Sequence, residues 1–323
     1  MQARITALST HVPEQIQTNF DFEKSIDTND EWIVSRTGIH QRRYAAADEF
    51  TSDLCRKAAQ KLVTECGKNL DDVDFIIVGT TTPDQEMPSM ACQLQHQLGI
   101  PRAGALDIKA ACAGFTYGLI LAQGLIAAGS AKKVLVVGGE TLSKVTDFTD
   151  RTTCILFGDG AGAALVEAAE QSNILGTLSG ADGAHGPALY LSTRRGIVNG
   201  QPILTDGNVH QDGRRVFKWA VETVAREASA LASKCGFSIG EIDWFVPHSA
   251  NRRIIDSVCQ QLEFPTDRAL DSIVYHGNTS AASIPLAIDL AQKAGKLTKG
   301  DRLLLFGFGG GLTYAGVLIE WDW

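Results

Sequence analysis

The strongest constraint on the fold is a regular alternation between short runs of Val, Ile and Leu and longer alanine-rich stretches. The apolar runs occupy residues 74–78, 133–139, 243–247 and 302–306. Stretches of helical composition lie between them, for example 113–128 and 283–293. Strands that are apolar on both faces are typical of a sheet that helices cover on each side. The sequence therefore predicts an α/β fold.

The alternation occurs twice along the chain. Cys112 and Gly129 bound a predicted helix in the first half, and Asn278 and Gly295 bound one in the second; both intervals are 17 residues (129 − 112 and 295 − 278). A chance coincidence is the alternative, but the shared strand and glycine pattern favours a duplication. We predict two similar halves, 1–172 and 173–323, with an irregular seam at 171–186. Frequent Gly, Asn, Asp and Pro predict loops or a small insertion at 180–213.

Composition narrows the possible functions. The 323 residues are 44% apolar and 20% charged, as in ordinary globular proteins. A net charge of −8 disfavours general nucleic-acid binding, which needs a basic face, and no apolar run has the ~18 residues of a membrane helix. The N-terminus does not resemble a signal peptide, and the seven cysteines include no CxxC pair. We therefore expect a cytoplasmic protein with reduced thiols, and the scattered histidines predict no metal site.

Cys112 is the candidate nucleophile. It lies among small residues where an extended segment meets a predicted helix. The unpaired backbone N–H groups and the dipole at a helix N-terminus favour the thiolate, which is the nucleophilic form. The other six cysteines are expected to be mostly buried apolar residues, and the same packing role is the alternative for Cys112.

Two further residues follow predicted strands or sharp turns. His248 comes directly after the apolar run 243–247, and Asn278 follows Gly277 at the start of a predicted helix. Ligand-binding groups in α/β folds collect at the carboxyl ends of strands, so both could donate hydrogen bonds to a reacting oxygen. The alternatives are that both residues cap helices and that His276 replaces Asn278. The glycine-rich loop 307–311 could present backbone N–H groups to an oxyanion.

Six segments, in this order, resemble β-ketoacyl-acyl-carrier-protein synthase III, the initiating condensing enzyme of type II fatty-acid synthesis. They are residues 27–39, 107–119, 157–162, 246–251, 276–282 and 307–311, and the resemblance covers essentially the whole chain. The resemblance implies the thiolase fold, in which two pseudo-symmetric α/β halves form an α-β-α-β-α layered arrangement. This expectation agrees with the duplicated pattern.

The resemblance implies ping-pong acyl transfer, with no metal or redox cofactor. Cys112 would take the acyl group from an acyl-CoA, and the backbone N–H groups of Cys112 and Gly310 would bind the oxyanion. His248 and Asn278 would stabilise the enolate that forms when malonyl-acyl-carrier protein loses CO2. The product would be a 3-oxoacyl-acyl-carrier protein.

The resemblance also implies substrate contacts. For CoA and its pantetheine arm they fall at Trp32, Arg36, Arg151, Phe157, Phe217, Asn251 and Phe308. Acyl-carrier protein is acidic, so basic clusters on this acidic chain should attract it. The residues expected to bind it are Arg214, Arg215, Lys218, Ser249, Ala250, Asn251, Arg252 and Arg253. The alternatives are an ordinary core for the phenylalanines and a solvated helix face for the cations.

Family members are usually homodimers in which a loop reaches into the neighbour's acyl pocket. The matching segment is 83–89, which places Met87 at the pocket border. Because Met is flexible, the pocket could admit branched primers such as isobutyryl-CoA as well as acetyl-CoA. The competing functions are a related Cys-His-Asn condensing enzyme or acyltransferase of secondary metabolism, a non-catalytic scaffold, and a Cys-His hydrolase.

Overall fold

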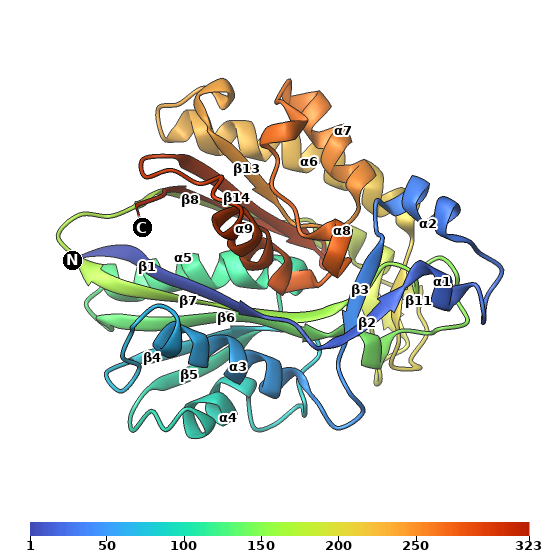
Figure 1. The fold of residues 1–323 in the computed structure, drawn as a ribbon, viewed down its shortest axis with the longest axis horizontal. Helices are drawn as coiled ribbons and strands as arrows, with labels where there is room; N and C mark the ends of the chain where they lie inside the picture. The colour runs from blue at the N-terminus through green and yellow to red at the C-terminus, as the bar shows by residue number, and fades with distance from the viewer. Residues whose placement is uncertain (323) are drawn as a thin grey trace.

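Two β-sheets organise the computed structural model, which describes residues 1–322 (Figure 1). The first sheet has the strand order β1-β7-β6-β4-β5 and the second the order β13-β14-β15-β8. The strands of the first are β1 (Gln2–His11), β4 (Phe75–Gly79), β5 (Gly104–Ile108), β6 (Lys133–Thr141) and β7 (Asp159–Ala169). Those of the second are β8 (Ile174–Ala181), β13 (Trp244–Pro247), β14 (Arg302–Gly309) and β15 (Thr313–Glu320).

Helices form three layers around the two sheets (Figure 1). The central layer consists of α5 (Gly114–Ala127) and α9 (Ser283–Lys293), which contact strands of both sheets. The outer face of the first sheet is covered by α3 (Thr51–Thr64) and α4 (Met90–Gln97), and that of the second by α6 (Gly213–Lys234) and α7 (Arg252–Leu262). The α/β class and the five-layer thiolase arrangement are therefore confirmed.

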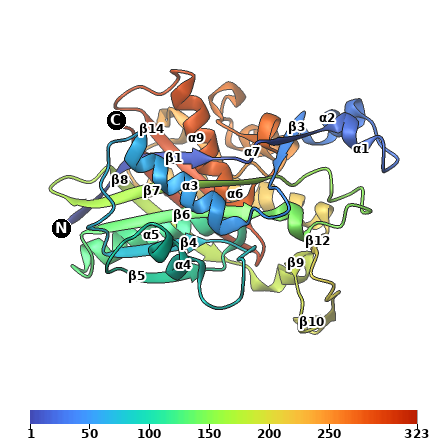
Figure 2. The ribbon, with the colours of Figure 1, turned by 60° about the horizontal axis from the view of Figure 1, so that its bottom comes forward.

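The remaining elements are short and lie mostly at one end of the molecule. The helices are α1 (Asn19–Phe22), α2 (Asp30–Thr37) and α8 (Ile273–His276). The strands are β2 (Gln15–Thr18), β3 (Gln41–Tyr44), β9 (Leu189–Leu191), β10 (Ile197–Val198), β11 (Gln201–Pro202) and β12 (Val209–Gln211). Strands β9 to β12 form two small ribbons that project from the body (Figure 2), which confirms the predicted insertion at 180–213.

The strands and helices predicted from the apolar alternation are confirmed. The four predicted runs form β4, β6, β13 and β14, and the two alanine-rich stretches form α5 and α9. Small residues let α5 approach the sheet closely, because a Cβ on Gly79 would lie only 2.6 Å from the carbonyl carbon of Gly114. This close approach holds the start of α5, and hence the preceding turn, against the carboxyl end of β4.

The irregular conformation predicted for the segment 171–186 is wrong for most of its length. Residues 174–181 form β8, an outer strand of the second sheet that pairs antiparallel with β15. Its Gly176 serves packing rather than a turn, since a Cβ there would lie 2.3 Å from Cys235 Sγ. The strands of the first sheet all end by residue 169 and those of the second begin at 174. The boundary between 172 and 173 itself stays a prediction.

Among the described residues, no helix is long and apolar enough to cross a membrane.

Candidate active site

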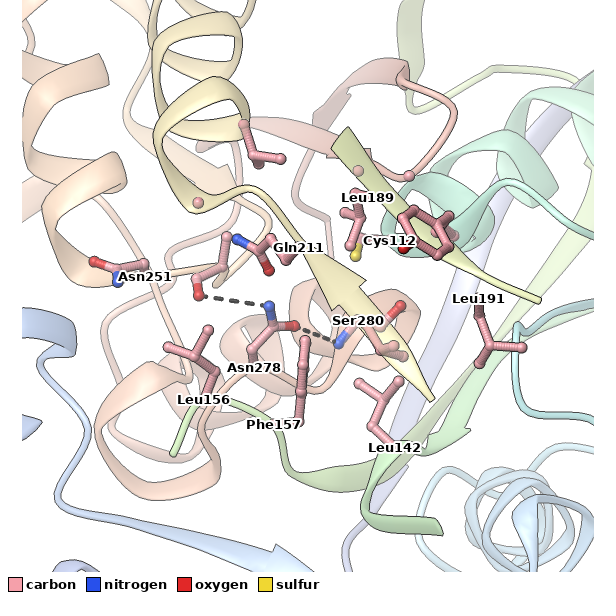
Figure 3. Close-up of a pocket in the computed structure, with 18 of the residues that line it drawn as sticks. Cys112, Leu142, Leu156, Phe157, Leu189, Leu191, Gln211, Asn251, Asn278 and Ser280 are labelled. Atoms are coloured by element: carbon pink, nitrogen blue, oxygen red, sulfur yellow. Dashed lines mark hydrogen bonds between the residues drawn. The ribbon is translucent and has the colours of Figure 1, made fainter. Parts of the chain in front are cut away.

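A cavity of about 1040 Å³ lies where the two halves of the chain meet (Figure 3). Cys112 from the first half, and His248 and Asn278 from the second, all line it. These three residues are far apart in the sequence, and the fold brings them to one cavity because each follows a strand end or precedes a central helix.

Cys112 lies in a single turn of 3₁₀ helix, residues 111–113, immediately before α5. The preceding residue, Ala111, has φ +46°, a conformation that non-glycine residues rarely adopt and that is typical of functional turns. The glycine loop passes beside the sulfur, since a Cβ on Gly309 would lie 2.9 Å from Cys112 Sγ. A side chain at position 309 would therefore crowd the nucleophile.

The protonation of Cys112 differs from the sequence expectation. Burial raises the pKa of its thiol to about 12, although the nearby hydroxyl of Ser280 opposes the shift. The buried carboxylate of Glu140 raises this pKa further, because a second negative charge nearby is unfavourable. Burial therefore disfavours the thiolate that the sequence predicts, and the free protein holds the nucleophile as a neutral thiol at neutral pH.

Glu140 is a residue that the sequence analysis missed. It is fully buried at the end of β6 and accepts hydrogen bonds from the backbone N–H groups of Thr81 and Thr82 and from nearby hydroxyls. One of these is the Ser280 hydroxyl, 3.0 Å from Glu140 Oε1. Burial raises the pKa of Glu140, while these hydrogen bonds lower it. The sequence did offer one signal for Glu140, namely its position directly after the apolar run 133–139.

His248 follows β13 and is 1% exposed. Its Nδ1 lies 2.7 Å from the hydroxyl of Ser283, and its ring packs edge-on against Phe308 with 5.3 Å between centroids. Burial lowers the pKa of His248 to about 3, so the imidazole is neutral at neutral pH. Ser283 was also missed, because a serine at the start of a helix normally indicates only a cap.

Asn278 is held so that its amide nitrogen is the donor on the cavity side (Figure 3). Its Oδ1 accepts from the backbone N–H of Ser280 at 2.9 Å, and its Nδ2 donates to the carbonyl of Ala250 at 3.5 Å. The competing candidate His276 is buried but does not line the cavity. The position of Asn278 thus combines a capping bond with a donor directed to the cavity.

Both residues that were expected to stabilise the oxyanion through their backbone N–H groups lie at the cavity. Cys112 and Gly310 both line the cavity, and a Cβ on Gly310 would lie 3.4 Å from Ala111 Cβ. The glycine loop 307–311 therefore runs against the turn that carries the nucleophile. Such backbone N–H groups are the donors that stabilise developing oxyanions.

Six of the seven expected CoA contacts line the cavity, and Arg151 is the exception. The ring centroid of Trp32 lies 5.3 Å from Arg36 Cζ and 5.0 Å from Arg151 Cζ, so two guanidinium groups face the indole. Arg151 itself does not line the cavity and donates to the carbonyl of Asp27 at 2.7 Å, whereas the neighbouring Thr152 does line it. The six expected CoA contacts that do line the cavity are Trp32, Arg36, Phe157, Phe217, Asn251 and Phe308.

The residues expected to bind acyl-carrier protein differ in their exposure to solvent. Exposed cations near the cavity are Arg214, Arg215, Lys218 and Arg253, and two of them, Arg214 and Arg253, line its mouth. Ser249 is a correction: it is 0% exposed, and its hydroxyl accepts the backbone N–H of Ser272, so it cannot contact a docked protein.

The other three expected docking residues, Ala250, Asn251 and Arg252, are neither fully exposed nor fully buried. Ala250 and Asn251 are partly buried and line the cavity, and the side chain of Asn251 caps α7 by accepting the backbone N–H of Arg253. The guanidinium of Arg252 is paired with Asp256 and Asp271, both at 2.8 Å. Its charge is therefore largely balanced within the chain.

Met87 lies outside the cavity of its own chain. It is 86% exposed and does not line the cavity, although the neighbouring Glu86 does and pairs with Lys109 at 3.1 Å. In the part of the chain that the structure describes, no group of three His, Cys, Asp or Glu side chains could hold a metal ion.

Two family models match the chain. The model of 3-oxoacyl-[acyl-carrier-protein] synthase III matches residues 106–183, and that of its C-terminal part matches residues 232–321. A curated relative, β-ketoacyl-[acyl-carrier-protein] synthase III 2 of Bacillus anthracis, is 53% identical over 322 residues, which are 99% of this chain and 98% of that protein.

Solved structures agree with the sequence relatives. The structure of β-ketoacyl-[acyl-carrier-protein] synthase III from Thermus thermophilus has a TM-score of 0.95 at 42% identity and covers 99% of both chains. The priming β-ketosynthase of the R1128 polyketide biosynthetic pathway has a TM-score of 0.91 at 34% identity, over 99% of this chain and 96% of that one.

Proposed function

The chain belongs to the 3-oxoacyl-[acyl-carrier-protein] synthase III family, and from that premise we propose the role of each residue in its cavity. It is an acyltransferase that condenses an acyl-CoA primer with malonyl-acyl-carrier protein, with loss of CO2, and so initiates fatty-acid synthesis. The observation that carries the residue assignment is that Cys112, His248 and Asn278 line a single cavity.

In the first half-reaction, Cys112 Sγ attacks the thioester carbon of the acyl-CoA. The C–S bond to CoA breaks, the acyl group remains on the cysteine, and the thiol proton leaves with the CoA sulfur. The backbone N–H groups of Cys112 and Gly310 stabilise the oxyanion between these events. A neutral resting thiol fits this scheme, because the proton is lost only as the new bond forms.

In the second half-reaction, malonyl-acyl-carrier protein enters the same cavity. His248 Nε2 and Asn278 Nδ2 donate hydrogen bonds to its thioester carbonyl, so the negative charge that forms as CO2 leaves has two donors. The resulting carbanion attacks the acyl-cysteine carbonyl and expels the Cys112 thiolate, which takes a proton from solvent to restore the neutral thiol. Apolar side chains, among them Leu156, Phe157 and Phe308, line part of the cavity, and they favour CO2 release and disfavour competing hydrolysis.

Both substrates approach through the same mouth. The indole of Trp32 and the guanidinium groups of Arg36 and Arg151 offer a stacking and phosphate-binding surface for the nucleotide end of CoA. Arg214 and Arg253 extend this basic rim and attract the acidic carrier protein. No metal or redox cofactor takes part in the proposed chemistry.

The active form is a cytoplasmic homodimer in this proposal. The strand β5 is the outer strand of the first sheet, and its Leu106 is exposed, so a second copy can pair with this edge. Met87 would then reach the neighbour's acyl pocket and set its preference among acetyl-CoA and short branched acyl-CoA primers. Light scattering on the purified chain tests the dimer, and a strong preference for acetyl-CoA over isobutyryl-CoA would contradict the branched-primer hypothesis.

Separating the two half-reactions tests the assignment. The protein is incubated with radiolabelled acyl-CoA, and malonyl-acyl-carrier protein is then added. Cys112→Ala should not take label, whereas His248→Ala and Asn278→Ala should be labelled but release little CO2. Cys92→Ala, which changes an exposed cysteine outside the cavity, is the matched control. Equal loss of both half-reactions in all three variants would contradict these roles, and release of free acid would indicate a hydrolase.

A further inference from the structure

A buried serine lies directly behind the catalytic imidazole. Ser283 is the first residue of α9 and is 0% exposed. Its Oγ lies 2.7 Å from His248 Nδ1 and accepts the backbone N–H of Ser249 at 3.3 Å. The contact joins a loop of the second sheet to a central helix, so it sets the position of the ring relative to Asn278 and the cavity.

The hydrogen-bond inventory of Ser283 fixes which way this bond runs. A serine hydroxyl has one hydrogen to donate and can accept two. Ser283 Oγ already accepts from the Ser249 N–H, and across residues 1–322 the only acceptor recorded for its own hydrogen is His248 Nδ1. If Nδ1 carried the hydrogen instead, the buried hydroxyl would accept two bonds and its own hydrogen would have no partner, so we infer that the hydroxyl donates to Nδ1. A neutral imidazole that accepts at Nδ1 carries its hydrogen on Nε2.

We propose that Ser283 is a positioning residue that holds His248 in the Nε2–H tautomer. The inference deepens the proposed function and rests on it, because a donor at Nε2 is what the thioester carbonyl of the malonyl group requires. Within residues 1–322 Nε2 has no hydrogen-bond partner, and it is not among the buried unpaired atoms, so it is open to the cavity that His248 lines. Phe308 packs edge-on against the ring and restricts its rotation.

The tautomer also limits His248 to one of the two half-reactions. A ring with hydrogen on Nε2 has no lone pair on the cavity side, so His248 cannot accept the proton of Cys112. Its contribution is confined to decarboxylation and condensation. Neutrality is a condition for this arrangement, and burial supplies it by lowering the pKa of His248 to about 3.

The tautomer can be measured directly on the intact wild-type protein. Two-bond 1H–15N correlation spectra of protein with 15N-labelled histidine distinguish protonated from unprotonated ring nitrogens, and His248→Gln assigns the signals of His248. We expect a protonated Nε2 and an unprotonated Nδ1 at pH 7.5. A protonated Nδ1 would overturn the proposal, whether or not the protein is an active synthase.

Variants test the catalytic consequence. Ser283→Ala should give averaged ring signals and lower the kcat of condensation roughly tenfold or more, with the rate of Cys112 acylation unchanged. Ser283→Thr, which retains the hydroxyl, should restore both the single tautomer and kcat. Ser272→Ala is the matched control, because Ser272 is a neighbouring buried serine that does not contact the ring.

The outcomes separate this inference from the proposed function. Normal condensation by Ser283→Ala would overturn the positioning role while leaving the function intact. Normal condensation by His248→Ala would contradict the proposed function, yet the wild-type spectrum would still report the tautomer. If Ser283→Ala does not fold, the wild-type spectrum and Ser283→Thr decide the question.

Discussion

Raising the pH should increase the alkylation rate of Cys112 about tenfold per pH unit, without a plateau, between pH 7 and pH 10. Only the thiolate reacts with iodoacetamide, so the rate follows the thiolate fraction. Burial raises the pKa of Cys112 from its ordinary value of 9.0 to about 12, a difference of three units. The thiolate is therefore about a thousandfold rarer than for an ordinary thiol, which corresponds to about 4 kcal/mol.

Peptide mapping by mass spectrometry after timed exposure to iodoacetamide resolves the rate at each cysteine. The buried Cys55, which lies outside the cavity, shows in the same digest whether unfolding at high pH contributes, and the exposed Cys92 gives the rate of an accessible thiol. Preincubation with acyl-CoA should protect Cys112 and leave Cys92 reactive. A rate that levels off below pH 9 would refute the reasoning, because it would mean that the helix dipole outweighs burial in this cavity.

Three further predictions follow from single features of the structure. Gly309→Ala places a Cβ about 3 Å from the sulfur of Cys112 and should slow acylation at least tenfold, whereas Gly124→Ala, where a Cβ meets nothing within 4 Å, should be active; equal activities in acylation assays would argue against the crowding. Burial lowers the pKa of His276 from 6.5 to about 4, so the unfolded chain binds more protons and stability falls as pH drops below 6.5; urea unfolding should show that His276→Gln loses about 2.5 kcal/mol less than wild type between pH 7 and pH 4.5, and identical losses would exclude this residue as a cause. Trp32→Ala should raise the KM for acyl-CoA roughly tenfold with little change in kcat, since in the proposed function the indole binds a part of the substrate remote from the reacting carbon; a lower kcat at unchanged KM would place Trp32 elsewhere in the mechanism.

Local patterns determined much of the architecture. The apolar runs that became β4, β6, β13 and β14 are continuous because each strand is covered on both faces, so their burial is visible in composition alone. The same logic located Cys112, His248 and Asn278, which lie at strand ends or helix starts. The strand β8 escaped because glycine is normally a loop signal, and only the contact of Gly176 with Cys235 explains its presence in a strand.

The amino-acid sequence by itself indicated the α/β class and the three candidate catalytic side chains, because strand burial and strand-end positions are encoded locally, and its family resemblance indicated the layered fold. Tertiary structure decided their chemical state. Glu140 meets Ser280 across 140 positions, and Ser283 meets His248 across 35, so neither contact leaves a mark in local sequence. Desolvation likewise depends on every segment that covers the cavity, which is why the neutral thiol, the neutral imidazole and the burial of Ser249 emerged only when the chain was folded.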